Sequence, residues 1–316
     1  MARLGSSDLD VYPLNLGGNT FGWTSDKDTS FAVLDAYAVA GGNFVDTSDS
    51  YMASAPGLRG GESETVLGQW FHERGNRDAI VLATKVSRHP EFHGLAPDTI
   101  ARAAEASLRR LQTDHIDLYY AHYDDETVSM ADSLGAFDEL VRAGKVRCVG
   151  ISNYAPARVQ EWLDTADANG FARPVALQPH YNLVTREPFE SQYRPLAERF
   201  DLGVLPYFAL AAGFLAGKYR SEADLEGASR GAMAGRYLSP ESLAVVDELD
   251  KVAAAHDCAL ATVAVAWLLA QPTVVAPIAS ARVPEQLDAL LAATGLVLTD
   301  VELGRLGEVS ARVPVG

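Results

Sequence analysis

Ionisable and polar side chains follow several short apolar runs of this sequence, each at the point where the run ends. Asp46 ends the run NFVD, Lys85 ends VLATK, and His122 ends LYYAH. The next three runs end in Ser152 and Asn153, Gln178, and Tyr207. A carboxylate, an ammonium and an imidazole that meet in one site can hold and transfer a proton. These residues are therefore candidates for acid–base chemistry.

Taken singly, each of these residues also has a structural explanation. A charged residue often stands where a strand meets solvent, and a histidine after an apolar strand is often structural. Ser152 and Asn153 could cap a helix that starts near Pro156. Six successive runs with polar ends are harder to explain in this way. The pattern favours a fold that gathers these ends on one rim.

Eight short apolar runs have the length of buried strands, and amphipathic stretches of helical length separate them. The strand-like runs cover residues 14–18, 43–47, 79–85, 116–122, 146–152, 175–179, 202–207 and 273–279. The helical stretches cover residues 30–40, 62–73, 97–111, 130–143, 156–168 and 192–200. Strands that alternate with helices predict a parallel sheet, and continuous apolar runs indicate strands buried on both faces.

An α/β chain with eight such units can close as a (β/α)8 TIM barrel or form a doubly wound open sheet. The GxGxxG fingerprint expected of an open sheet that binds dinucleotides is missing from LNLGGNTFG, which favours the barrel. Active sites of barrels lie on the rim formed by the carboxyl ends of the strands. We expect one domain over residues 1–316, with an N-terminal hairpin, a long loop at 208–240 after the seventh strand, and extra helices at 241–255 and 299–310.

The composition indicates a compartment and excludes some partners. The formal net charge is −16, with 42 acidic and 26 basic residues, so we expect neither nucleic acid nor an anionic membrane surface as a partner. Two cysteines are too few for a disulfide framework and indicate a reducing compartment, the cytoplasm. The N-terminus lacks an apolar signal segment. The apolar stretch 258–279 is interrupted by Gln271 and Pro272, which predicts a buried helix and strand rather than a membrane span.

Two local patterns resemble ligand-binding motifs, one for a metal ion and one for a phosphate, but neither is complete. His89 and His93 are four residues apart, but Pro90 between them indicates a loop, and no HExxH motif surrounds them. We therefore expect no metal site. The segment GFLAGKY has one residue too few between its glycines for a P-loop, and Tyr219 replaces the required Ser or Thr.

Several segments together resemble the signature segments of the aldo-keto reductase superfamily. They are NFVDTSDSY (43–51), GESE (61–64), VLATKV (81–86), LYYAH (118–122), GKVRCVGISNY (144–154), PYFALAAGFLAGKY (206–219) and PIASARVPEQL (277–287). The resemblance extends from Leu4 to about Leu306, nearly the whole chain. It implies a TIM barrel that transfers hydride from NADPH to the carbonyl of an aldehyde or ketone.

The resemblance assigns a catalytic role to four residues. Tyr51 becomes the general acid that protonates the carbonyl oxygen, a role that only the resemblance provides. Lys85 is expected to lower the pKa of Tyr51, because a nearby ammonium favours the phenolate. Asp46 would keep Lys85 charged, and His122 would orient the substrate oxygen and help to relay the proton.

The resemblance also implies a set of cofactor-binding residues. For the nicotinamide, it assigns Ser152, Asn153 and Gln178 to the carboxamide and Tyr207 to the ring face. For the phosphates and adenine, it assigns backbone N–H groups of the run from Leu210 through Gly213 to Lys218, then Ser280, Arg282 and Gln286. Ser280 and Arg282 match the positions that clamp the 2′-phosphate, which favours NADPH over NADH. Leu290 stands where the family usually has Asn, so one adenine contact is in doubt.

The substrate side is expected to be aromatic. Trp23, Phe92, Tyr123 and Phe208 fall in loops after strands and could line an apolar pocket for a carbonyl compound with a hydrophobic body. Two alternatives stay open: a Schiff-base aldolase on the same barrel with Lys85 as nucleophile, and a non-catalytic regulatory or sensor subunit that binds NADPH.

Overall fold

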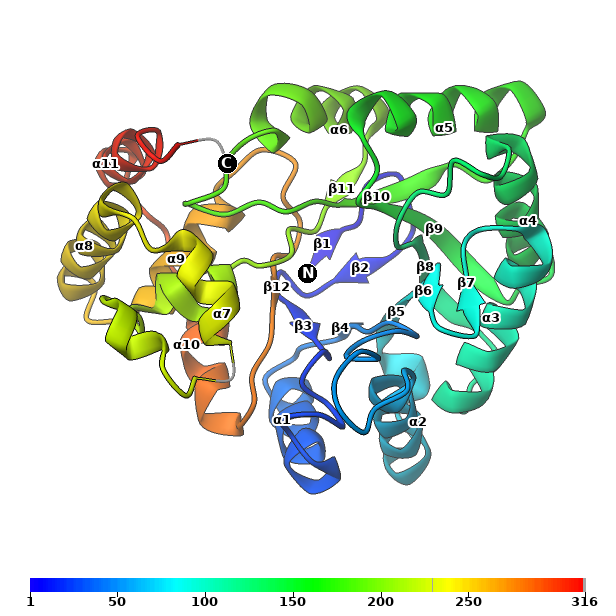
Figure 1. The fold of residues 1–316 in the computed structure, drawn as a ribbon, viewed down its shortest axis with the longest axis horizontal. Helices are drawn as coiled ribbons and strands as arrows, with labels where there is room; N and C mark the ends of the chain where they lie inside the picture. The colour runs from blue at the N-terminus through cyan, green and yellow to red at the C-terminus, as the bar shows by residue number, and fades with distance from the viewer. Residues whose placement is uncertain (229, 315–316) are drawn as a thin grey trace.

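The expected strands form one parallel eight-stranded sheet that curls into a ring (Figure 1). This computed structural model describes residues 1–228 and 230–314. Along the sheet the order is β11-β10-β9-β8-β5-β4-β3-β12. The strands are β3 (Asn15–Gly17), β4 (Phe44–Asp46), β5 (Val81–Val86), β8 (Ile116–Ala121), β9 (Val146–Ser152), β10 (Pro174–Gln178), β11 (Gly203–Val204) and β12 (Ile278–Ala279).

The two edges of this sheet meet through the residues beside β11 and β12. Val204 forms a parallel bridge with Val274, and its carbonyl accepts the N–H of Val275 at 2.9 Å. The N–H of Ile278 donates to the carbonyl of Pro206 at 2.9 Å. The predicted (β/α)8 TIM barrel, rather than an open sheet, is thereby confirmed.

Helices surround the ring of strands, as Figure 1 shows. The helices that follow the first six strands of the barrel are α1 (Lys27–Val39), α2 (Glu62–Arg74), α3 (Pro97–Leu111), α4 (Met130–Arg142), α5 (Pro156–Asn169) and α6 (Arg194–Phe200). A π-helical turn at Phe189–Tyr193 precedes α6. Pro97 and Pro156 stand in the first turns of α3 and α5, where a missing N–H costs nothing. Gly170 ends α5 with a φ of 66°, a left-handed conformation that suits glycine.

The N-terminal hairpin closes one end of the barrel. Its strands, β1 (Ala2–Arg3) and β2 (Asp10–Val11), pair antiparallel, and Figure 1 places them across the middle of the ring. Leu4 and Val11 are fully buried in the same apolar cluster as Phe44 and Leu205. Access to the barrel interior is therefore from the carboxyl ends of the strands.

In its described residues, the long segment after β11 forms short elements. They are the 3-10 helices Ala211–Ala216, Glu222–Leu225 and Gly235–Tyr237, and the single helical turn α7 (Gly231–Ala234). The expected extra helices follow as α8 (Pro240–Ala255) and, near the C-terminus, α11 (Asp300–Ser310), with α9 (Leu260–Leu269) and α10 (Leu287–Ala292) between them. A further small hairpin, β6 (Arg88–His89) with β7 (Phe92–His93), follows β5.

Stretch 258–279 contains α9, whose side chains are mostly buried, and then β12, as expected. Within the described parts of the chain, no single helix is long and apolar enough to cross a membrane. The bent pair of α8 and α9 meets the same test by length and composition only.

Alternation along the strands decides which side chains enter the barrel. Val45 and Leu82 belong to the apolar cluster shared with the helices, whereas Phe44 and Ala83 belong to the cluster inside the barrel. Side chains two residues apart on a strand share a face. Asp46 and Lys85 therefore point into the barrel at its open end.

Candidate active site

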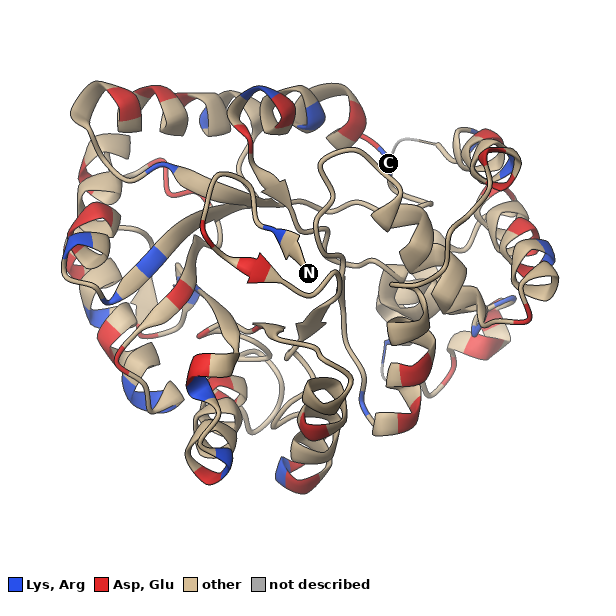
Figure 2. Ribbon diagram, turned by 180° about the vertical axis from the view of Figure 1, so that it is seen from behind, with Lys and Arg blue, Asp and Glu red and all other residues tan. Residues whose placement is uncertain are grey.

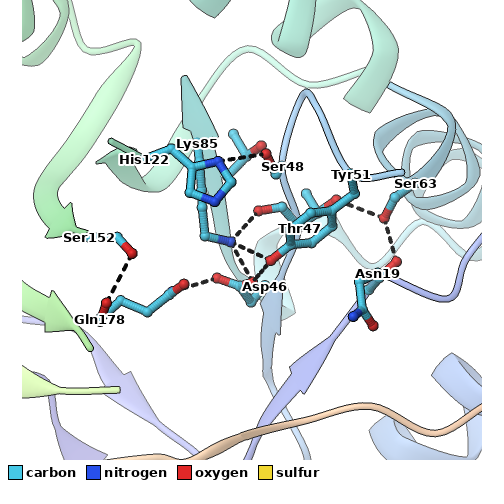
Figure 3. A network of polar contacts seen from close by, with 12 residues as sticks. Asn19, Asp46, Thr47, Ser48, Tyr51, Ser63, Lys85, His122, Ser152 and Gln178 are labelled. Atoms are coloured by element: carbon cyan, nitrogen blue, oxygen red, sulfur yellow. Dashed lines mark hydrogen bonds and ion pairs between the residues drawn. The ribbon is translucent and has the colours of Figure 1, made fainter. Parts of the chain in front are cut away.

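Three residues from two neighbouring strands and one loop form the centre of the site (Figure 3). Lys85 Nζ donates to Asp46 Oδ2 at 2.5 Å, to the Thr47 carbonyl at 2.7 Å and to Tyr51 Oη at 2.6 Å. Tyr51 in turn donates its hydroxyl proton to Asp46 Oδ2 at 2.5 Å. Strands β4 and β5 are paired, which brings the carboxylate and the ammonium together. The loop after β4 folds back to add the phenol.

Burial dominates the electrostatics of this group. Both Lys85 and Asp46 are fully buried, and burial lowers the pKa of Lys85 while the Asp46 carboxylate opposes that shift. The pKa of Tyr51 is raised well above its usual value, first by burial and then by Asp46. Burial and the Asp46 carboxylate therefore set the direction of the shift, which is opposite to the one expected from Lys85 alone. The phenol has lost its hydration and donates its proton to a carboxylate, so its neutral form is favoured.

His122 follows β8 and faces Tyr51 across the mouth. The two rings are 6.3 Å apart in an edge-to-face arrangement. Nδ1 of His122 lies 3.4 Å from Ser48 Oγ, a contact drawn in Figure 3. Burial, and then Lys85 and Arg88, lower the pKa of His122 well below its usual value. The imidazole is therefore neutral at neutral pH.

The residues expected at the nicotinamide carboxamide form one hydrogen-bonded chain. Ser152 is fully buried, and its hydroxyl donates to the Gln178 carbonyl at 2.9 Å. Asn153, with a φ of 54°, donates from Nδ2 to Ser152 Oγ at 2.9 Å and to the His122 carbonyl at 3.0 Å. Tyr207 donates its hydroxyl to Asn153 Oδ1 at 2.8 Å, and Gln178 Nε2 donates to Asp46 Oδ1 at 2.9 Å. This chain joins the polar ends of β9, β10 and β11 to the central carboxylate.

A cavity of about 480 Å³ extends from Tyr51 and His122 along the open end of the barrel toward α9 and α10. The expected site residues that line it are Tyr51, His122, Tyr123, Asn153, Gln178, Tyr207, Phe208, Leu210, Gly213, Lys218, Ser280, Arg282 and Gln286. Asp46, Lys85 and Ser152 lie beneath this lining and act on it through hydrogen bonds. Leu290 also lines the cavity, and its apolar side chain offers no hydrogen bond there.

Two aromatic residues expected in the pocket, Trp23 and Phe92, are not among the residues that line this cavity. Trp23 lies in a tight turn that is closed by the Ser25 N–H donating to the Thr20 carbonyl at 3.0 Å. Phe92 lies in β7, where its ring packs against His89 and under the Arg102 guanidinium of α3. The chain turns back as a hairpin after β5, which carries Phe92 toward α3 and away from the mouth.

The chain has 42 acidic and 26 basic residues, and Figure 2 shows Asp and Glu on the helices around the barrel. Basic side chains nevertheless gather at the far end of the cavity. Lys218, Arg230 and Arg282 all line it. Burial and the two arginines lower the pKa of Lys218, and burial and Arg282 lower the pKa of Arg230. Among the described residues, neither Lys218 nor Arg230 forms an ion pair with a carboxylate. Lys218 and Arg230, two neighbouring cations without an ion pair among the described residues, fit an anionic ligand.

Arg230 and Asn19 are cavity residues that the sequence pattern did not identify. Arg230 Nη2 donates to Asn19 Oδ1 at 3.3 Å, and Ser280 Oγ donates to the same oxygen at 2.8 Å. The only sequence signal for Arg230 was a basic residue within the long segment after β11. Its place in the cavity depends on how that segment folds back.

The run from Leu210 to Lys218 uses some of its backbone donors internally. The Gly213 N–H donates to the Leu210 carbonyl at 2.8 Å, and the Leu215 N–H donates to the same carbonyl at 3.2 Å. In this structure the Gly213 N–H is therefore used within the run, which closes into tight turns, although Gly213 lines the cavity. The feature of this run that best suits an anionic ligand is the charge of Lys218.

Comparison with known proteins agrees with this geometry. The Aldo/keto reductase family profile matches residues 13–311. The chain is 34% identical to aldo-keto reductase ausK of Aspergillus calidoustus, over 96% of this chain and 80% of that protein. It is also 34% identical to the uncharacterized oxidoreductase YrpG of Bacillus subtilis (96% and 93%), and 32% identical to norsolorinic acid reductase B of Aspergillus parasiticus (95% and 81%).

The chain belongs to the aldo/keto reductase family. The family and its reductase-named members support an oxidoreductase that acts on small molecules.

Proposed function

We propose that this protein, as one catalytic domain, is an NADPH-dependent reductase of aldehydes or ketones with Tyr51 as the general acid. The observation that carries the proposal is the position of Tyr51. Its hydroxyl is held between Lys85 Nζ at 2.6 Å and Asp46 Oδ2 at 2.5 Å, and its side chain lines a cavity with a basic far end. A proton donor and an anion-binding region in one cavity are what a phosphate-bearing hydride donor and a carbonyl substrate require.

The residues of the cavity fit NADPH, which supplies hydride from its nicotinamide when bound. Its phosphates would be held by Lys218 and Arg230, with Ser280 and Arg282 at the 2′-phosphate and Gln286 at the adenine. The arginines suit phosphate because a guanidinium donates two parallel hydrogen bonds. At the other end, the carboxamide would be held by Asn153 and Gln178, with Tyr207 against the ring. Ser152 would position these two residues through its hydrogen bonds to both. Leu290 packs apolar surface near the adenine position.

The chain's own residues manage the proton. Tyr51 is neutral in the site, and its hydroxyl proton, which is donated to Asp46 Oδ2 in this structure, would be transferred to the oxygen of a bound carbonyl as the carbon takes up hydride. The phenolate that remains is stabilised by Lys85 Nζ, and His122 as a neutral imidazole orients the same oxygen. A positioned acid of this kind contributes about 10²–10⁴-fold to the rate.

The structure favours a substrate with a hydrophobic body. Tyr123 and Phe208 line the cavity, and Phe208 is 38% exposed, which makes its ring available to a ligand. Some relatives are named for a reductase of norsolorinic acid. We extend to this chain only the class of an apolar aldehyde or ketone.

The Schiff-base aldolase alternative has less support than the reductase. Lys85 is fully buried beneath Tyr51, and its three donors already have partners. A nucleophilic lysine must present a neutral amine to the substrate carbonyl, and this geometry hinders that approach. The regulatory-subunit alternative is left to experiment.

The test is NADPH oxidation against a panel of aldehydes, ketones and sugars, with Tyr51→Phe as the matched variant. We expect turnover on at least one apolar carbonyl and a loss of about 10²–10⁴-fold in Tyr51→Phe. NADPH binding to the variant, followed by fluorescence, should remain close to that of the unmodified chain. Full turnover by Tyr51→Phe would refute the acid assignment. Tight NADPH binding without turnover on any substrate would support the regulatory alternative.

A further inference from the structure

His180 is a half-buried polar residue beside the cavity that the proposed reaction does not use. It follows β10 and forms a parallel bridge with Tyr207, the residue after β11 that lines the cavity. The two rings are stacked, with centroids 5.3 Å apart and planes 14° apart. His180 itself does not line the cavity. One face of Tyr207 is thus supported by an imidazole.

The neighbours of His180 determine which of its nitrogens carries the proton. The Asn182 amide is oriented by two backbone partners: Oδ1 accepts the Val184 N–H at 2.9 Å, and Nδ2 donates to the Phe208 carbonyl at 2.9 Å. That Nδ2 also lies 3.5 Å from His180 Nε2. An amide nitrogen only donates, so Nε2 of His180 is the acceptor and lacks a proton.

Tyr237 supplies the stronger hydrogen bond to this nitrogen. Its hydroxyl lies 3.0 Å from His180 Nε2 and, because Nε2 is an acceptor, donates to it. Burial lowers the pKa of His180 to about 4, so the imidazole is neutral near neutral pH and this hydrogen bond persists. Tyr237 belongs to the 3-10 helix Gly235–Tyr237 of the long segment after β11. A residue some thirty positions from Tyr207 along the chain therefore fixes the ring behind it.

We propose that His180, fixed by Tyr237, is a positioning residue that holds the Tyr207 ring in the plane needed to stack on the nicotinamide. The inference rests on the proposed function and adds to it. Three contacts constrain the Tyr207 ring in this structure: its hydroxyl donates to Asn153 at the tip, the Phe208 ring packs edge-on against it, and the His180 ring covers one face. The tip bond alone leaves the ring free to tilt about that contact. The stacked imidazole removes this freedom before the cofactor binds, which lowers the entropy cost of binding.

The pair can be dissected with variants that change one feature each. His180→Phe keeps a flat ring behind Tyr207 but removes the acceptor, and Tyr237→Phe removes only the donor. Tyr12→Phe is the control, because its hydroxyl contacts Thr294 Oγ1 at 3.2 Å, outside the cavity. Two ligands are titrated against the full chain: NADPH, by its fluorescence, and adenosine 2′,5′-bisphosphate, which lacks the nicotinamide. Circular dichroism checks that each variant is folded.

We expect the NADPH dissociation constant to rise by about three- to tenfold in His180→Phe and in Tyr237→Phe, the loss expected for one hydrogen bond. The double variant should lose no more than either single one, because both remove the same bond. The dissociation constant of the bisphosphate should stay unchanged in all of them. If His180→Phe does not fold, Tyr237→Phe alone decides the question.

Unchanged NADPH affinity in Tyr237→Phe would overturn the inference, as would an equal loss for both ligands or the same loss in Tyr12→Phe. The unmodified chain separates this failure from that of the proposed function. If the unmodified chain binds NADPH and the variants match it, only the role of His180 is refuted. If the unmodified chain does not bind NADPH, the proposed function fails and the inference fails with it.

Discussion

The buried ion pair of Lys85 and Asp46 is expected to contribute to both catalysis and stability. A single variant and a double variant separate these two contributions. Lys85→Met removes the cation and leaves the Asp46 carboxylate with two neutral donors, the Tyr51 hydroxyl and Gln178 Nε2. A buried charge that loses its counter-ion costs about 3–5 kcal/mol. We expect the free energy of unfolding to fall by about that amount, less what Asp46 regains by taking up a proton.

Turnover should fall for a separate reason. Without the ammonium, the Tyr51 phenolate that forms on proton transfer loses the cation that lies 2.6 Å from its oxygen, so kcat should drop by about 10²–10⁴-fold. The double variant, Asp46→Asn with Lys85→Met, removes both charges. It should recover most of the lost unfolding free energy, because no unpaired charge stays buried, but it should recover none of the turnover.

Urea unfolding followed by tryptophan fluorescence measures the first quantity, and NADPH oxidation on the best substrate measures the second. If Lys85→Met unfolds at the same urea concentration as the unmodified chain, the buried-charge reasoning is wrong. It is equally wrong if the double variant is no more stable than Lys85→Met. Full turnover by Lys85→Met would remove Lys85 from the proton-transfer machinery.

Three further predictions concern other parts of the site and the barrel. Arg282→Ala should raise the Michaelis constant for NADPH by about 10–100-fold and that for NADH far less; equal effects would refute the 2′-phosphate assignment. The pKa of His122 in the folded chain lies well below its value in the unfolded chain, about 6.5. The unfolded chain therefore takes up a proton first, and the free energy of unfolding falls as the pH drops below about 6.5 toward the folded pKa. Between about pH 7.5 and 5.5, urea titrations should therefore show a loss of stability about 1.4 kcal/mol larger in the unmodified chain than in His122→Gln, and identical losses would contradict the shift. Gly150→Ala should cost about 1–3 kcal/mol, because its Cβ would lie 2.5 Å from the Tyr120 ring, whereas Gly304→Ala, with open space around it, should cost nothing in the same unfolding assay.

The residues at the strand ends are the part of the site that could be predicted from the sequence. Asp46, Lys85 and His122 were assigned to one rim from hydrophobic runs alone, and the barrel brings Asp46 and Lys85 into direct contact. This worked because parallel strands buried on both faces leave continuous apolar runs, and a polar residue that ends a run marks the rim. The Gly/Ala-rich run near Lys218 lines the same cavity as Tyr51 and His122.

The sequence did not predict which loop side chains line the cavity. Phe92 and Trp23 follow strands in the sequence just as Tyr123 does, yet only Tyr123 lines the cavity. Arg230, which lines its basic end, had no recognisable position in the sequence. A loop carries no periodicity, so the direction of its side chains depends on turns and on contacts with distant segments.

By itself, the sequence determined the alternation of strands and helices and the polar residues at the strand ends, because burial imposes a repeating pattern on strands and helices. The barrel was favoured over an open sheet by a missing motif, and the role of Tyr51 came from the family resemblance. Only the tertiary structure decided how those groups interact. It buried Lys85 and Asp46 completely, placed the Tyr51 hydroxyl between them and thereby raised the pKa of Tyr51, against the direction expected from Lys85 alone. A pKa depends on desolvation as well as on nearby charge, and desolvation is a property of the folded chain rather than of any segment.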